Sequence, residues 1–397
     1  MRSRLALWVT LAAVVSAAGV FLFSTTATES GPGLPASHWQ QPLPGQGEAP
    51  KQWSKLERDL SPQGCAQCHE DQHRDWSQSL HAHAFSPGLV GQFPGMGVEE
   101  SNSCLNCHAP LAEQKLVIGT DIPKSLKLLD QQSSLERLPL RHAGVSCASC
   151  HVRGWMRFGP PRRDSDETGW IDGPAHGGFY ATKDFEKSQL CASCHQFPQS
   201  AAINGKPLEN TVAEWQMSRF AKEGVSCQGC HMPDRRHEFR GIHDPDMTRK
   251  GLTISLHKEK GKGELRMQST WIGHAFPTYV TPKIVVFAKA VDGQGQELDW
   301  WHWDIMREVA SDDGWHEIRD TRLMPGELRA FPVDPLPAGT QKLVFRVHVM
   351  PDEFYKGVYR GLLASNLAPQ AAKQIRSALN QANANDYLLY EGELTFP

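Results

Sequence analysis

Short runs of alternating hydrophobic and polar residues in the second half of the chain predict β-strands. The runs are rich in β-branched residues, and turns that contain glycine or proline separate them. The expected strands are Leu252–His257, Glu264–Ser269, Lys283–Ala290, Leu328–Pro332 and Lys342–Met350. Together they predict an antiparallel β-sandwich domain over residues 250–350. Residues 351–397 then predict a helix from Pro369 to about Ala382 and a last strand, Tyr387–Phe396, that returns to the sheet.

The first half of the chain has a different pattern, with few strand signals. Residues 1–30 carry two arginines and then an uncharged, mostly apolar stretch over residues 5–23, which is typical of a signal peptide or an N-terminal membrane anchor. Both alternatives predict an exported, periplasmic protein, either free or anchored to the inner membrane through residues 5–23. Residues 31–60 are rich in proline and glycine and predict a linker.

Composition and charge exclude several classes of protein. The chain has 397 residues, of which 40% are hydrophobic and 21% are charged. These values exclude wholesale disorder, a collagen-like repeat and a polytopic membrane protein. There are 41 Lys and Arg residues against 44 Asp and Glu, a net charge of −3. We therefore expect no nucleic-acid partner, because such proteins usually show a concentrated basic excess.

All ten cysteines fall in five Cys-x-x-Cys-His groups, which is the attachment signature of c-type haem. Two thiols three positions apart can bond the two vinyl groups of one porphyrin, and the next histidine becomes the proximal ligand of its iron. The sequence therefore predicts five covalently attached haem c groups. In chain order, motifs one to five have the cysteines Cys65 and Cys68, Cys104 and Cys107, Cys147 and Cys150, Cys191 and Cys194, and Cys227 and Cys230, and the proximal histidines His69, His108, His151, His195 and His231.

Two other uses of these cysteines fit less well. Zinc knuckles need no histidine after each pair, and five knuckles would leave one without a partner. Disulfides within each Cys-x-x-Cys pair would close very small loops and stabilise the fold little. The sequence also lacks a glycine-rich phosphate loop and a nucleophile elbow.

Residues 61–245 are predicted to form a pentahaem cytochrome c domain. The motifs follow one another at intervals of roughly 40 residues, which is too little polypeptide per haem for a conventional hydrophobic core. We therefore expect a mostly α-helical and irregular domain that wraps around the haems, with the porphyrins serving as its core.

Several segments outside the cysteine pairs carry a further pattern. They are His69…Trp76-Ser77…Ser79-Leu80-His81-Ala82, Glu214-Trp215, Gly224-Val225-Ser226-Cys227, His237–Pro245 and Gly273–Thr278. In these segments, over roughly residues 61–350, the chain resembles the exported multihaem c-type cytochromes related to hydroxylamine oxidoreductase. That family includes both electron carriers and catalysts, so the resemblance implies haem binding and export and leaves the reaction open.

The 18 histidines include candidates for the sixth, distal ligand of each iron. The resemblance implies a distal role for His81, with His83 as its alternative, and for at least one of His237 and His243. His142 lies too close to motif three to reach the distal face of that haem and is expected to serve a neighbouring one.

Two further candidates lie in loops. His176 stands in a glycine-rich segment, where glycine permits close approach to a porphyrin. His274 stands within the predicted sandwich, in a segment that makes a poor strand. A loop that reaches back to cap a haem would explain this composition, whereas the alternative is a histidine that stabilises the sandwich. Trp300, Trp301 and Trp303 are expected in the sandwich core or on a docking surface.

The sequence leaves two functions open. An iron with two histidine ligands is saturated and only passes electrons, whereas an open iron can bind nitrogen oxides. The abundance of histidine favours an electron-transfer protein with five closely packed, mostly bis-histidine haems. The alternative is a multihaem oxidoreductase with one open haem that acts on nitrite or hydroxylamine. The expected partner is a redox protein or a membrane quinol-oxidising complex, and a homo-oligomer is a further alternative.

Overall fold

The computed structural model describes residues 33–131, 139–311 and 314–397. The predicted signal peptide or anchor over residues 5–23 lies outside the described residues. Within the described ranges, no helix is both long enough and apolar enough to cross a membrane.

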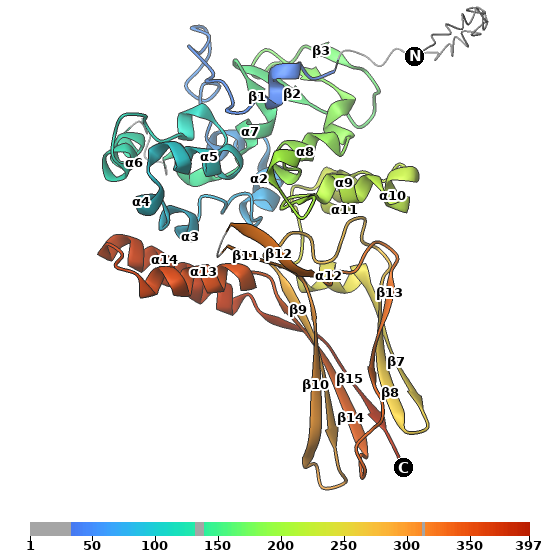
Figure 1. Ribbon diagram of the computed structural model, residues 1–397. Coiled ribbons are helices and arrows are strands. Elements are labelled where there is room, and N and C mark those ends of the chain that lie inside the picture. Colours follow the sequence, from blue (N-terminus) through green and yellow to red (C-terminus); the bar gives the residue numbers. More distant parts are fainter. Residues whose placement is uncertain (1–32, 132–138, 312–313) are drawn as a thin grey trace, which may run out of the picture.

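The cysteine motifs lie at one end of the molecule, among short helices joined by irregular segments, as Figure 1 shows. The helices are α1 (Pro62–Cys65), α2 (Glu70–Ser77), α3 (Pro87–Val90), α4 (Phe93–Met96), α5 (Val98–His108), α6 (Ile122–Gln131), α7 (Cys147–His151), α8 (Gln189–His195), α9 (Thr211–Gln216), α10 (Arg219–Lys222), α11 (Cys227–His231) and α12 (Pro245–Gly251). This region is mostly helical and irregular, as the sequence predicts.

Six strands of two to four residues complete this region. One small sheet has the order β1-β2-β4-β3, and β5 pairs with β6 in a hairpin. Their bounds are β1 (Val152–Arg153), β2 (Met156–Gly159), β3 (Gly169–Ile171), β4 (Phe179–Ala181), β5 (Ala202–Ile203) and β6 (Lys206–Pro207).

Two larger antiparallel sheets form the other end of the molecule (Figure 1). A four-stranded sheet has the order β10-β9-β14-β15, a three-stranded sheet has the order β13-β8-β7, and β11 and β12 form a separate hairpin. The strands are β7 (Leu252–Glu259), β8 (Lys262–Ser269), β9 (Lys283–Val291), β10 (Glu297–Ile305), β11 (Arg307–Ser311), β12 (Trp315–Asp320), β13 (Leu328–Val333), β14 (Lys342–Met350) and β15 (Tyr387–Thr395).

One hydrophobic cluster joins the two larger sheets. Leu265 and Met267 of β8, Ile284 of β9 and Phe345 of β14 are among its fully buried members. The alternating burial along β8 and β14 is what a strand with one face toward a core requires. The five strands expected from the sequence are all present, and β10, β11 and β12 are additional.

The C-terminal segment contains one more helix than the sequence suggests. Helix α13 (Glu353–Ala364) precedes α14 (Pro369–Ala384), and β15 then pairs antiparallel with β14, which confirms the returning strand. Helix α14 packs against α3 of the motif region, so this tail contacts both ends of the molecule. A Cβ on Gly91 would lie only 2.7 Å from the Ile375 side chain, which explains a glycine at this contact.

The predicted linker is irregular, but its first part packs onto the region of motif three. His38 and Leu43 are buried, with 1% and 2% of their surfaces exposed. The His38 ring lies 2.9 Å from the Cys150 carbonyl oxygen, and Arg153 donates a hydrogen bond to the His38 carbonyl. This segment therefore belongs to the folded structure around the third motif.

Candidate haem-binding site

The cysteine motifs take a helical conformation that suits attachment of a flat ring. Helices α7 and α11 consist of the motif alone, and α5 and α8 end at the motif histidine. Residues three and four apart lie on the same side of a helix, so one turn presents two thiols and an imidazole together. Motif one differs, because α1 ends at Cys65 and His69 stands at the start of α2.

The ten cysteines are free thiols, so the fold contains none of the disulfides that a cysteine framework would need. Thiols of different motifs come into contact. Interactions between side chains shift the pKa values of three pairs of cysteines: Cys65 with Cys147, Cys107 with Cys194, and Cys191 with Cys227. Motif three therefore lies next to motif one, and motif four lies next to motifs two and five.

Three pairs of histidine rings stand at the same separation. Ring centroids are 6.3 Å apart for His81 and His195, for His151 and His237, and for His231 and His274. A metal-bound imidazole nitrogen lies about 2.0–2.1 Å from the metal and about 1.1 Å from its ring centroid, so two imidazoles on opposite sides of one metal have centroids about 6.3 Å apart. Each pair joins a proximal histidine to a distal candidate.

Hydrogen bonds at Nδ1 leave the Nε2 atoms of His151, His231 and His274 free. Nδ1 of His151 lies 2.7 Å from the Phe158 carbonyl oxygen, and Nδ1 of His231 lies 2.6 Å from that of Arg240. Nδ1 of His274 is likewise 3.0 Å from the Ala275 carbonyl oxygen. Because a carbonyl oxygen only accepts, Nδ1 carries the proton and Nε2 keeps a lone pair for a metal.

Burial also keeps four of the paired rings neutral. It lowers the pKa of His81 to about 3 and the pKa values of His151, His195 and His274 to about 4. An imidazole must be unprotonated to bind iron, so these rings are in the required state at neutral pH. Together with the Cys-x-x-Cys spacing, these observations show that the side chains present fit haem c.

The other distal candidates have different surroundings. His176 lies close to His69, since burial and then the charge of His176 lower the pKa of His69, and Nδ1 of His176 is 2.8 Å from the Gly178 carbonyl oxygen. Nε2 of His142 is 3.8 Å from an Asp130 carboxylate oxygen. Nε2 of His243 is 3.0 Å from an Asp352 carboxylate oxygen, so this ring is already engaged.

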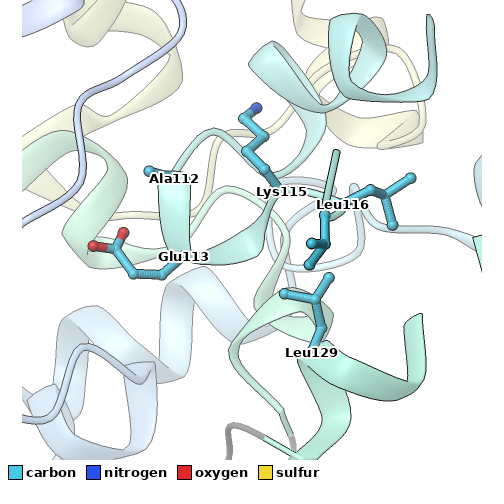
Figure 2. Close-up of a pocket in the computed structure, with 6 residues that line it drawn as sticks. Ala112, Glu113, Lys115, Leu116 and Leu129 are labelled. Carbon is cyan, nitrogen blue, oxygen red and sulfur yellow. The ribbon is translucent and has the colours of Figure 1, made fainter. Parts of the chain in front are cut away.

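A surface cavity lies apart from these histidines. Figure 2 shows its lining, and its volume is about 390 Å³. The residues that line it are Ala112, Glu113, Lys115, Leu116, Val117 and Leu129. None of these six is a histidine or a cysteine, so the cavity is no candidate for iron binding.

Sequence reasoning missed one contact of a proximal histidine. Nδ1 of His195 lies 2.5 Å from the Tyr279 hydroxyl, in place of the backbone carbonyl used by His151 and His231. Tyr279 has a positive φ of 67°, which is rare for a residue with a side chain. Tyr279 follows the Gly273–Thr278 segment, so the loop that carries His274 toward motif five also reaches motif four. Only the fold brings Tyr279 and His195 together.

The tryptophans of β10 divide between the two sides of the sheet. Trp301 and Trp303 pack against the shared hydrophobic cluster, as expected of core residues. Trp300 is 54% exposed and stacks on His302 at 5.6 Å. The alternation follows from the two-residue period of a strand.

The fold is similar to that of a solved multihaem c-type cytochrome, and the five Cys-x-x-Cys-His motifs match the attachment signature of haem c. Residues 64–152 match the family of cytochrome c554 and cytochrome c-prime. The solved structure of a pentahaem cytochrome c552 from Thermochromatium tepidum is similar, with a TM-score of 0.56 and 18% sequence identity over 86% of this chain and 100% of that one. No curated protein matches the chain. Neither match names hydroxylamine oxidoreductase, so that relationship stays a prediction.

Proposed function

We propose that the protein is an electron-transfer cytochrome with five haem c groups, most of them bound by two histidines. The three histidine pairs with ring centroids 6.3 Å apart carry this proposal. In it, His237 is the distal ligand of motif three, His81 that of motif four and His274 that of motif five. The proximity of His176 to His69 supports His176 as the distal ligand of motif one.

The chemistry follows from this ligand set. A haem held between two of these imidazoles would supply one-electron transfer and would have no position left for a substrate. The backbone carbonyls that hold Nδ1 orient the rings and raise their basicity. Buried rings exclude water from the iron. Such a site transfers electrons and performs no other reaction.

The contacts between motifs indicate the path of the electrons. Motif one adjoins motif three, and motif four adjoins motifs two and five through cysteine pairs. Burial and then the charge of Cys194 raise the pKa of Cys150, which indicates that motif three lies close to motif four. We infer a chain of haems in the order one, three, four, with haems two and five both next to haem four.

Intact mass and low-temperature EPR test this proposal on the full holoprotein. The mass should show five covalent haems. A mass that matches three or four would contradict haem attachment at all five Cys-x-x-Cys-His motifs. His274→Ala should convert one low-spin iron to a high-spin signal that binds carbon monoxide after reduction. His257→Ala is the control, because His257 is exposed in β7 and bonds only to Ser255 among the contacts described. An unchanged spectrum for His274→Ala would remove His274 from the ligand set.

A second function is favoured by motif two. Nδ1 of His108 is 3.1 Å from the Ala84 carbonyl oxygen, so Nε2 is free, but no described histidine ring stands at a comparable separation from it. In this version the haem of motif two is open and reduces nitrite or hydroxylamine. A high-spin signal from about one haem in five in the unmodified protein, removed by nitrite, would support it.

Four further parts of the proposal concern the two regions of the fold, the location of the protein and its partner. We propose that the haems form the core of the motif region and that the two larger sheets are a β-sandwich domain beside it. We also propose export through residues 1–30 to the periplasm. The partner would be a redox protein or a membrane quinol-oxidising complex. Co-purification from membranes with and without residues 5–23 tests the anchor.

A further inference from the structure

Two helices that are far apart in the sequence hold two haem motifs in the same way. The indole nitrogen of Trp76, in α2, donates to the Val145 carbonyl at 2.8 Å. The indole nitrogen of Trp215, in α9, donates to the Val225 carbonyl at 2.9 Å. Val145 and Val225 each stand two residues before the first cysteine of a motif, within the shared Gly-Val-Ser-Cys lead-in of motifs three and five.

The residue before each tryptophan is acidic and holds the segment of a distal histidine. Asp75 accepts a hydrogen bond from the backbone N–H of His237 at 3.2 Å. Glu214 accepts one from the backbone N–H of Ala275, next to His274, at 3.1 Å. His237 is paired with motif three and His274 with motif five, which are the motifs that Trp76 and Trp215 hold.

An arginine completes each arrangement. Arg236 donates to both carboxylate oxygens of Asp75, at 2.7 and 2.8 Å. Arg322 donates to Glu214 at 3.1 Å, and both side chains of this pair are only 3% exposed. Asp75 itself is 7% exposed, so each carboxylate is buried and its charge is compensated by the arginine.

The same short sequence underlies both copies. Asp75-Trp76-Ser77-Gln78-Ser79 and Glu214-Trp215-Gln216-Met217-Ser218 share an acidic residue, a tryptophan and a serine in the same register. Ser79 and Ser218 each donate to the carbonyl of the tryptophan three residues earlier, at 2.7 Å in both cases. The chain thus contains one structural unit twice, although the rest of the surrounding sequence does not repeat.

We propose that Asp75 and Glu214 are positioning residues that hold His237 and His274 over the irons of motifs three and five. This inference rests on the proposed bis-histidine ligation. In each unit, one helix binds the proximal motif through its tryptophan and the segment of the distal histidine through its carboxylate. The same helix therefore positions both histidines of the pair. The unit keeps the two imidazoles at the separation that a single iron requires.

Carbon monoxide titration of the reduced holoprotein tests this inference. Asp75→Ala and Glu214→Ala should each create as many as one new carbon monoxide binding site per molecule. The double variant should create as many as two. The gain in carbon monoxide binding should be larger for Glu214→Ala than for Asp75→Ala. Arg322, the partner of Glu214, is buried, whereas Arg236, the partner of Asp75, is half exposed. EPR should show the matching loss of low-spin iron. Asp75→Asn and Glu214→Gln keep an acceptor oxygen and should restore most of the low-spin signal. If the alanine variants fail to fold, Asp75→Leu and Glu214→Met replace them, because these side chains fill a similar space without an acceptor oxygen.

Three controls separate positioning from general stability. Asp71→Ala alters an exposed acid of the same helix α2, which pairs with Arg74, and should add no site. Glu223→Ala alters an exposed acid that pairs with Arg219 and should also add none. Arg307→Ala removes a buried ion pair outside the unit and should lower stability without adding a site.

The outcomes separate the ligand assignment of His237 and His274 from the positioning role of Asp75 and Glu214. If His237→Ala and His274→Ala add binding sites but Asp75 and Glu214 variants add none, the ligand assignment holds and the positioning inference is wrong. If the two histidine variants add no site either, the ligand assignment fails and the inference falls with it.

Discussion

At the scale of single residues, the partner of Nδ1 distinguishes one proximal histidine from the others. His108, His151 and His231 each place Nδ1 next to a backbone carbonyl oxygen, whereas His195 places it next to the Tyr279 hydroxyl. A side chain can be replaced without altering the backbone, so this hydrogen bond is open to direct test. With Nε2 on iron, Nδ1 carries the proton and the Tyr279 oxygen accepts it.

We expect Tyr279→Phe to raise the reduction potential of the motif four haem. Loss of the acceptor makes the His195 imidazole a weaker base and stabilises the ferric state less. Spectroelectrochemical titration, which resolves the five haems, measures the shift. Tyr387→Phe is a matched control, because Tyr387 also donates through its hydroxyl, to the Ile242 carbonyl, but contacts none of the three histidine pairs in the contacts described. An equal shift in both variants would speak against a specific role of Tyr279.

At the scale of elements, Arg307 fastens the motif region to the sheet region. Its fully buried guanidinium donates to the carbonyls of Ile203, Lys206 and Pro207, which belong to the β5–β6 hairpin. It also pairs with Glu317 of β12 at 2.9 Å. The Arg307 guanidinium therefore binds backbone carbonyls of the motif region and a carboxylate of the sheet region at the same time.

Arg307→Ala should destabilise the protein by about 3–5 kcal/mol, because it leaves three buried carbonyls without a donor and leaves the Glu317 carboxylate with only Lys206 and Asn204 as partners. The free energy of unfolding, measured by denaturant titration of the holoprotein, checks this. Arg319→Ala on the same hairpin is the control: Arg319 is 42% exposed, and its ion pairs with Glu308 and Asp304 should contribute only about 0–1 kcal/mol. Similar losses of stability in both variants would show that Arg307 contributes no more to the contact between the two regions than Arg319 does.

At the scale of the whole molecule, the neighbours of each motif do not follow the order of the chain. Motif four adjoins motifs two and five and lies close to motif three. Motif one adjoins only motif three among the described cysteine contacts. In the proposed haem chain, motif four is therefore the junction between the outer motifs.

Removing the junction should slow electron exchange between the haems of motifs one and five. The change is Cys191→Ala with Cys194→Ala, which deletes both attachment points of motif four. Electron transfer slows steeply with distance, so the remaining haems should equilibrate more slowly after a fast single-electron injection followed optically. Deleting motif one by Cys65→Ala with Cys68→Ala is the control, and it should leave exchange between motifs two, four and five unchanged. Unaltered exchange in the first variant would contradict the inferred order.

Strand prediction succeeded where one face of a strand is buried. The pattern of Lys342–Met350 alternates over its whole length, and β14 has these bounds. It failed for β10, where the aromatic run Trp300-Trp301-His302-Trp303 hides the alternation, although only alternate rings face the core. It also failed for β11 and β12, because charged residues such as Glu308 and Arg319 mask their pairing.

The sequence by itself determined the features that depend on neighbouring residues. Cys-x-x-Cys-His places its reactive groups within one helical turn, so attachment and proximal ligation follow from local spacing. The tertiary structure decided which distal histidine meets which motif, since His81 and His195, or His231 and His274, approach only after distant segments have packed. It also decided that Asp75 and Glu214 reach the segments of His237 and His274. Contacts across such separations depend on the whole chain, and no local pattern specifies them.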